Sequence, residues 1–157
     1  MPSDRFFKVM NGVHRALLKA SRGKLGWTVG SMPVLELTTI GRKSSNPQSV
    51  FLTSPCQENG RFVIVASKGG ASNNPDWFRN LCENPHVIVT TEGNRTRKMI
   101  SRVASTKDRE RLWPIIVSKH RNYARYQKAI GRQIPLVILE PEDCPSTTED
   151  GHSRRNP

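Results

Sequence analysis

The chain has 157 residues, a length that predicts one domain able to bury a core without disulfides or a structural metal. Apolar residues make up 35% and charged residues 24%, and 25 Lys and Arg against 13 Asp and Glu give a net charge of +12. This balance excludes a largely disordered chain, and no apolar run reaches the length of about 18 residues that a membrane-spanning helix needs. We find no secretory signal, and the three cysteines, Cys56, Cys82 and Cys144, form no CxxC pair. The sequence therefore predicts a protein of the reducing cytoplasm.

Both ends of the chain differ from its middle. Residues 1–26 are predicted to hold an amphipathic basic helix from Phe6 to Arg22, with its apolar residues on one side and its basic residues on the other. Such a helix can pack on the core of the domain, or it can lie on an anionic membrane or cover a pocket. Residues 142–157 contain no aliphatic or aromatic residue, so we expect a disordered tail. The tail carries four acids and two bases, which leaves about +14 on the rest of the chain.

Between these ends, residues 27–141 are predicted to form the folded domain. β-branched and apolar residues separated by turn-forming residues predict strands at Val34–Ile40, Ser49–Thr53, Arg61–Ser67, His86–Glu92, Arg95–Ala104 and Ile134–Glu140. Helices are predicted at Asn74–Asn84 with Asn73 or Asn74 as its N-cap, at Lys107–His120 with Ser105 as its cap and a bend or restart at Pro114, and at Asn122–Ala129. Because strands and helices do not alternate, the order excludes a doubly wound parallel sheet. It favours a small antiparallel barrel with helices packed outside.

Two segments could bind an anion. Thr38–Ser44 is a strand that runs into a Gly-Arg-Lys turn, whose backbone N–H groups and cations can bind one anion, although such a turn can equally be a solvated strand end. Ala66–Trp77 combines a strand end, two glycines and a helix N-terminus, and Lys68 adds a positive charge. Trp77 could cover the face of a bound ring; alternatively, the glycines reverse the chain and Trp77 fills the core.

A third segment holds both tyrosines of the chain. His120, Tyr123 and Tyr126 are three residues apart, so they are predicted to share one helix face. They can line a pocket or form a half-buried packing surface.

The sequence carries no recognisable catalytic motif of its own. The metal-binding HExxH, the nucleophile elbow GxSxG and the nucleotide-binding GxGxxG and GxxxxGK patterns are all absent, and we expect Cys82 to pack rather than react. A basic site of this kind suits an anionic cofactor that brings its own reactivity.

Taken in order, these segments resemble the deazaflavin-dependent nitroreductases, the F420H2-dependent quinone reductase family of mycobacteria and related actinobacteria. The resemblance covers residues 25–141 and rests on Leu37–Ser44, Val65–Ala71, Asn74–Leu81, Asn84–Val87, Trp113–Pro114, Tyr123–Gln127 and Arg132–Pro135. It implies a mainly β fold, a split β-barrel of the FMN-binding type with about six antiparallel strands and flanking helices. It also implies coenzyme F420, a deazaflavin with a phosphate and an oligoglutamate tail, which would match the basic body.

The resemblance implies an oxidoreductase that transfers a hydride from reduced F420 to a quinone, a nitro compound or an activated double bond. It implies that the cofactor is bound by Arg42, Lys43, Ser44, Gln48, Ser49, Val50, Phe51, Leu52, Thr53, Ala66, Ser67, Lys68, Asp76, Trp77, Phe78, Arg79, Asn80 and Tyr123. The residues implied to act in catalysis, lining the acceptor pocket, are Ser67, His120, Tyr123 and Tyr126. Ser67 and Tyr123 would donate hydrogen bonds to the acceptor oxygen where negative charge develops.

The chain departs from the family pattern in two ways. Ser45 and Gln48 stand where Gly and Arg are usual, which removes one phosphate-binding cation, and His120 stands where an aromatic residue is common. A protein that binds FMN, or that binds a cofactor without turnover, remains an alternative. A nucleic-acid-binding protein is disfavoured because the cationic strand Arg95–Lys98 lacks interleaved aromatic residues. We expect no metal and no nucleic acid partner; the alternatives left open are the oligomeric state and peripheral contact of residues 6–22 with the inner face of the cell membrane.

Overall fold

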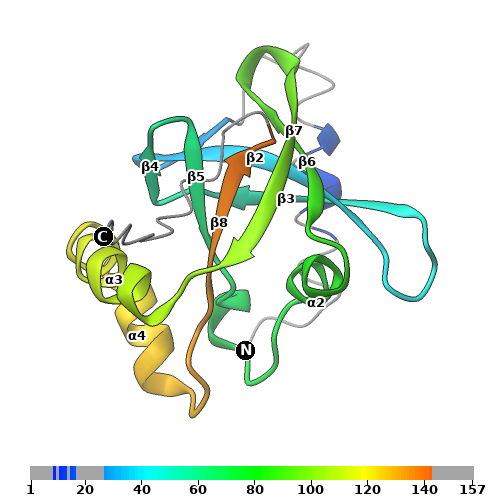
Figure 1. Cartoon of the computed structure of the whole chain (residues 1–157). Helices are drawn as coiled ribbons and strands as arrows, with labels where there is room; N and C mark the ends of the chain where they lie inside the picture. The colour runs from blue at the N-terminus through cyan, green and yellow to red at the C-terminus, as the bar shows by residue number, and fades with distance from the viewer. Residues whose placement is uncertain (1–8, 10, 14, 17–26, 143–157) are drawn as a thin grey trace, which may run out of the picture.

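The computed structural model describes residues 27–142, together with residues 9, 11–13, 15 and 16 of the N-terminal segment. An antiparallel sheet of eight strands curls into a half-barrel with helices around it (Figure 1). Its strand order is β1 (Thr28–Val29), β2 (Met32–Ile40), β6 (His86–Thr91), β7 (Arg95–Val103), β8 (Leu136–Pro141), β5 (Arg61–Val65) and β4 (Cys56–Glu58), and β3 (Pro47–Thr53) pairs with β2. The predicted antiparallel split barrel is confirmed. Strands β1 and β4 were not predicted, because their two and three residues are too few to show an alternating pattern.

The helices are α2 (Asp76–Glu83), α3 (Thr106–Lys119) and α4 (Arg121–Ala129), with short 3-10 turns η1 (Lys68–Gly70) and η2 (Glu92–Asn94). Ser105 caps α3 as predicted: its hydroxyl accepts the Asp108 N–H at 3.1 Å, and the Asp108 carboxylate accepts the Ser105 N–H at 3.1 Å. The predicted restart at Pro114 is wrong, because α3 continues through it.

The N-cap predicted for α2 is also wrong. Pro75 occupies that position, without a capping side chain. The physical reason is that Asn74 Oδ1 accepts a hydrogen bond from the Arg132 guanidinium at 2.7 Å instead. The carboxylate of Asp76, in the first turn, lies where a helix N-terminus favours negative charge.

Strands β5 and β8 are buried on both faces, which explains their continuous apolar sequences. Along β5, Ile64 belongs to a cluster with Leu37 and with Phe78 of α2, whereas Val63 belongs to a second cluster with Ile116 of α3. The sheet therefore separates α2 on one side from α3 and α4 on the other, as Figure 1 shows.

The described part of the N-terminal segment contacts the sheet through polar groups. Asn11 Oδ1 accepts the Phe51 N–H at 3.3 Å, and Arg15 lies 3.3 Å from a Glu36 carboxylate oxygen. Val9 and Val13 are 64% and 62% exposed, so the interpretation that this apolar stripe packs on the core is wrong for these two residues. The rest of the predicted helix, and residues 143–157 of the predicted tail, lie outside the described residues. Within residues 27–142 and the described N-terminal positions, no helix has the length and apolarity needed to cross a bilayer.

Candidate functional site

The buried side chain of Asn80 joins two of the predicted segments. Its Oδ1 accepts hydrogen bonds from the Arg42 backbone N–H at 3.2 Å and from the Arg42 guanidinium at 3.0 Å. Its Nδ2 donates to Thr39 Oγ1 and to Gln48 Oε1, both at 3.2 Å. An amide has two donor positions and two acceptor positions, and here all four are used within the protein. Asn80 therefore fixes the β2–β3 loop to α2 and has no hydrogen-bonding position left for a ligand.

The β2–β3 loop folds tightly over Gly41. The Gly41 N–H donates to Asn46 O at 2.9 Å, and Gly41 O accepts the Ser45 N–H at 2.8 Å. A Cβ at Gly41 would lie 2.5 Å from Ser44 Oγ and 2.8 Å from Gln48 Nε2, so no larger residue fits without a shift. Gln48 Nε2 lies 3.4 Å from Ser44 Oγ, so Gln48 closes this loop from within.

Cations surround the junction between this loop and α2. Arg42 lies 3.1 Å from an Asp76 carboxylate oxygen, so its guanidinium binds both Asp76 and Asn80. Lys43 on the loop and Arg79 on α2 are exposed. Cations held around a loop and a helix N-terminus form a surface that favours anions.

The loop between β5 and α2 is held in a left-handed turn. Lys68, Gly69 and Gly70 have φ angles of 46°, 61° and 83°. A Cβ at Gly70 would lie 3.1 Å from the Tyr126 ring, so both the backbone and the close ring require glycine there. Arg132 binds this loop through its guanidinium. Arg132 belongs to the residues of the family resemblance, but its sequence context predicts no role for it.

The predicted aromatic row forms, although it crosses a helix break. His120 lies between α3 and α4, and its ring contacts Tyr123 edge-on at 6.4 Å; Tyr123 contacts Tyr126 in the same way at 6.3 Å. The Tyr123 hydroxyl lies 3.2 Å from Thr53 Oγ1 at the end of β3. Burial raises the pKa of Tyr123, although the Thr53 hydrogen bond opposes this, so the phenol keeps its proton at neutral pH. The row lies next to the left-handed turn, because Tyr126 packs against Gly70.

Several residues that the resemblance assigns to the cofactor are buried among apolar side chains. Trp77 and Phe78 are 8% and 9% exposed and belong to the core cluster, which agrees with the alternative that Trp77 fills the core. Ala66 is fully buried in the same cluster.

The residues of β3 divide between two faces. Val50 and Leu52 pack against the core. Ser49 and Phe51 lie on the other face, where Ser49 Oγ is 2.7 Å from Thr38 Oγ1 and the Phe51 ring contacts Trp27 edge-on at 6.4 Å. A ligand bound on one face of β3 can therefore contact only every second side chain of the strand.

Among the described residues, the cysteines and the metal-binding side chains give no second reactive centre. Cys82 is exposed, so the expectation that it packs in the interior is wrong; partial burial and the nearby Glu83 raise the pKa of its thiol. A raised thiol pKa disfavours the nucleophilic thiolate. Among the described residues, no group of three or more His, Cys, Asp or Glu side chains could hold a metal ion.

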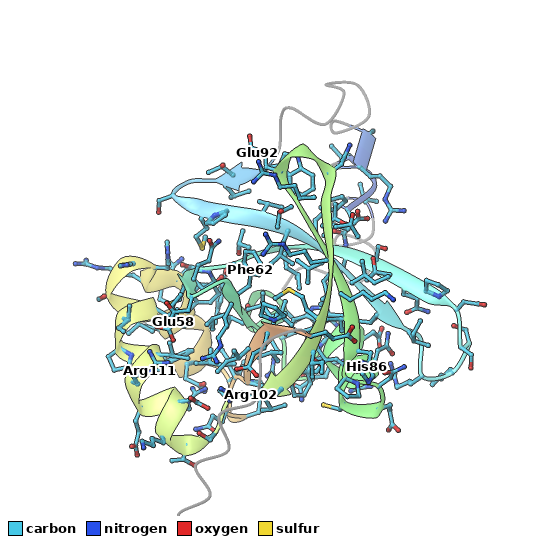
Figure 2. The ribbon with its side chains drawn as sticks, turned by 45° about the horizontal axis from the view of Figure 1, so that its top comes forward. Glu58, Phe62, His86, Glu92, Arg102 and Arg111 are labelled. Atoms are coloured by element: carbon cyan, nitrogen blue, oxygen red, sulfur yellow. The ribbon has the colours of Figure 1, made fainter. Side chains whose placement is uncertain are left out.

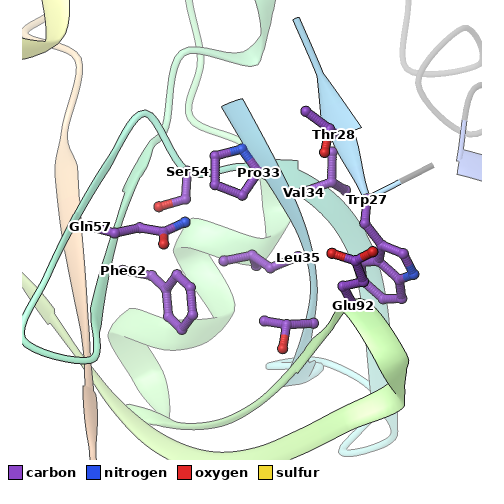
Figure 3. A pocket seen from close by; sticks show the side chains of 10 residues that line it. Trp27, Thr28, Pro33, Val34, Leu35, Ser54, Gln57, Phe62 and Glu92 are labelled. Atoms are coloured by element: carbon purple, nitrogen blue, oxygen red, sulfur yellow. The ribbon is translucent and has the colours of Figure 1, made fainter. Parts of the chain in front are cut away.

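A cavity of about 230 Å³ opens at the end of the barrel opposite the Asn80 junction. Its lining residues include Trp27, Leu35, Ser54, Gln57, Phe62 and Glu92 (Figure 3). Figure 2 shows the two ends of β6, with His86 at one and Glu92 at the other. His86 follows α2 closely in the chain, so the junction described above belongs to the His86 end and the cavity to the Glu92 end. The residues lining the cavity include none of the predicted site residues.

The comparisons with known proteins agree with this architecture. The model of the F420H(2)-dependent quinone reductase family matches residues 11–141. The chain belongs to this family. A protein of Mycobacterium tuberculosis (strain ATCC 25618 / H37Rv) named F420H(2)-dependent quinone reductase is 35% identical over 132 residues, which cover 81% of this chain and 87% of that protein.

Two solved structures of family-level similarity share the fold. An F420-H2 dependent reductase, FDR-A, is 35% identical with a TM-score of 0.61 and covers 69% of this chain and 94% of its own. A second, described as a domain-swapped dimer, is 31% identical with a TM-score of 0.64 and covers 83% of this chain and 98% of its own. A protein of the pyridoxinephosphate oxidase family from Clostridium acetobutylicum, 11% identical with a TM-score of 0.51 over 82% of this chain and 85% of its own, shares the fold alone.

Proposed function

We propose that this chain is an F420H2-dependent reductase that transfers a hydride from the reduced cofactor to a quinone. The observation that carries the proposal is the Asn80 junction, which joins the basic β2–β3 loop to α2 in a chain of the F420H2-dependent quinone reductase family. The left-handed turn and the aromatic row extend the same region. We propose that the three segments together bind the cofactor and the acceptor.

The charges at this surface suit coenzyme F420. Its phosphate and oligoglutamate tail are anionic, and Arg42, Lys43, Lys68 and Arg79 are cations set around the α2 N-terminus and the neighbouring loops. Gln48 is neutral and bonded within the loop, so Lys43 and Arg79 are the exposed cations in the proposed phosphate and tail site. We propose that the tail lies over these two cations.

The bound F420H2 would supply the hydride. In this proposal, the protein holds donor and acceptor at reactive distance and provides hydrogen bonds to the acceptor oxygen as it gains charge. Tyr123 is suited to donate because burial keeps its phenol protonated. Ser67, His120 and Tyr126 would complete the acceptor pocket.

We further propose that the protein acts at the cytoplasmic side and touches the membrane through residues 6–22. Support comes from Val9 and Val13, one helical turn apart and exposed, whereas Asn11 and Arg15 contact the sheet. Sedimentation with anionic lipid vesicles tests this: Val13→Asp should weaken binding, and equal binding of both proteins would overturn it.

The reaction itself is tested by following oxidation of F420H2 with menadione as acceptor, and with a nitroaromatic compound in parallel. Turnover with the quinone supports the proposal as stated. Turnover with the nitro compound alone would keep the enzyme class and overturn the quinone assignment. No oxidation with either acceptor, by protein shown to bind F420, would favour a cofactor-binding protein without turnover.

A further inference from the structure

Arg132 bridges both ends of the left-handed turn. Its Nη2 donates to Ala66 O at 3.2 Å and Ser67 O at 3.3 Å, before the turn. Its Nε donates to Ala71 O at 3.2 Å and its Nη1 to Asn74 Oδ1 at 2.7 Å, after the turn. All four acceptors are neutral. Burial lowers the pKa of Arg132, although a guanidinium stays charged at every pH at which the protein is used.

The turn needs such a bridge. Lys68 is not a glycine yet has a φ of 46°, a conformation that costs energy and persists only when its surroundings impose it. Within the turn itself, Gly70 donates to Ser67 O at 2.9 Å and Ala71 to Lys68 O at 3.2 Å. Lys68 Nζ also donates to Asn73 Oδ1 at 3.5 Å, and the Tyr126 ring packs against Gly70. Arg132 adds four charge-assisted bonds that join the two ends of the turn.

The segment that carries Arg132 is itself fixed from its other side. Gln127 Nε2 donates to Arg132 O at 2.8 Å, and Gln127 Oε1 accepts the Ile134 N–H at 2.8 Å. Arg109 of α3 donates to Ile134 O and, at 3.3 Å, to Gln127 Oε1, while its guanidinium lies 4.3 Å from the centre of the Trp113 ring. Gln127 of α4 by itself makes two hydrogen bonds to this segment, at Arg132 O and at the Ile134 N–H, so the segment stays attached to α4 without Arg109.

We propose that Arg132 is a positioning residue that holds the 66–74 loop in its binding conformation before the cofactor arrives. This rests on the proposed function, in which Ser67 and Lys68 meet cofactor and acceptor. Arg132 need not touch either molecule. Because Arg132 orders the loop before the cofactor binds, binding does not have to order it, and the free-energy cost of ordering is avoided at that step.

Arg109 provides the matched control. It is also a half-buried arginine that binds neutral oxygens around Gln127, but it does not contact the 66–74 loop. We expect both Arg132→Met and Arg109→Met to lower the thermal midpoint. Only Arg132→Met should make the amides of residues 67–74 exchange with deuterium about tenfold faster in the protein without cofactor.

Binding provides the second measurement. Arg132→Met should raise the Kd for F420 about tenfold and Arg109→Met less than about twofold, with Arg132→Lys between them because one ammonium cannot reach four acceptors. Equal exchange of the loop in the two methionine variants, or an unchanged Kd in Arg132→Met, would overturn the inference. If Arg132→Met does not fold, Arg132→Lys carries the same test. Wild-type protein that protects the loop but binds no F420 would refute the proposed function and, with it, the binding role of Arg132, whereas its loop-ordering role is decided by exchange alone.

Discussion

Replacing Asn80 by alanine should uncouple the β2–β3 loop from α2. The side chain is 2% exposed and makes four hydrogen bonds, to Arg42 twice and to Thr39 and Gln48. A net contribution of about 1 kcal/mol per bond gives an upper sum near 4 kcal/mol. Water can reach Arg42 and Gln48 once the loop moves, which restores part of this. We therefore expect a loss of about 2 to 3 kcal/mol in the free energy of unfolding.

Urea denaturation measures this loss, and F420 titration measures its effect on the site. The matched control is Asn84→Ala, also on the α2 side of the molecule, where Asn84 accepts a single hydrogen bond from the His86 N–H at 3.1 Å. That variant should lose less than about 1 kcal/mol. Because the Arg42–Asp76 ion pair then holds the loop to α2 without the four Asn80 hydrogen bonds, the loop becomes less fixed, so Asn80→Ala should also weaken F420 binding, whereas Asn84→Ala should not. Equal losses of stability in the two variants would refute the reasoning that Asn80 organises the loop.

Three further outcomes follow from the same contacts. Tyr123→Phe removes the hydroxyl bonded to Thr53 and should lower kcat about tenfold or more while leaving the Kd for F420 within about twofold; the reverse pattern would assign Tyr123 to the cofactor. Lys43→Ala should raise the Kd for F420 and flatten its dependence on salt, with kcat at saturating cofactor nearly unchanged, and an unchanged salt dependence would exclude Lys43 from the anion site. Hydrogen bonds from Arg102 and Ser105 hold the pKa of Asp108 at about 2, below its ordinary 3.8. The folded protein thus binds this proton less tightly than the unfolded chain, so about 1 kcal/mol of the free energy of unfolding, present above about pH 4, should be lost as the pH falls towards 2. Asp108→Asn should abolish this part of the pH dependence of stability. An identical acid transition in both proteins would contradict the assignment.

The longer strands and the capped helix were predictable from the sequence because their patterns are local. The Ser105 capping box spans only four residues of the sequence, and β5 and β8 are recognisable as continuous apolar runs. The two-residue β1 and three-residue β4 exist because of their partners, so their own sequence carries too little pattern. The N-cap of α2 was missed for a similar reason: Arg132, 58 positions away, binds Asn74.

The site divides in the same way. The three segments were recognisable from composition and resemblance, and the structure links them in pairs: Asn80 joins the β2–β3 loop to α2, and Tyr126 packs against Gly70. Long-range contacts decide which of these residues can meet a ligand. Asn80 and Gln48 use their side-chain amides in hydrogen bonds within the protein, and Trp77 is buried in the core. Arg132 was missed as a functional residue because its four acceptors lie 58 to 66 positions away. A sequence pattern that places an arginine before a buried strand gives no sign of them.

Titration of the purified protein with oxidised F420, with FMN in parallel, tests the central claim most directly. Ligand fluorescence would report both bindings under identical conditions. We predict micromolar binding of F420, weakened by salt and by Lys43→Ala, and no comparable binding of FMN. Binding of FMN alone would keep the barrel and contradict the deazaflavin chemistry. Binding of neither would contradict the cofactor site proposed around Asn80.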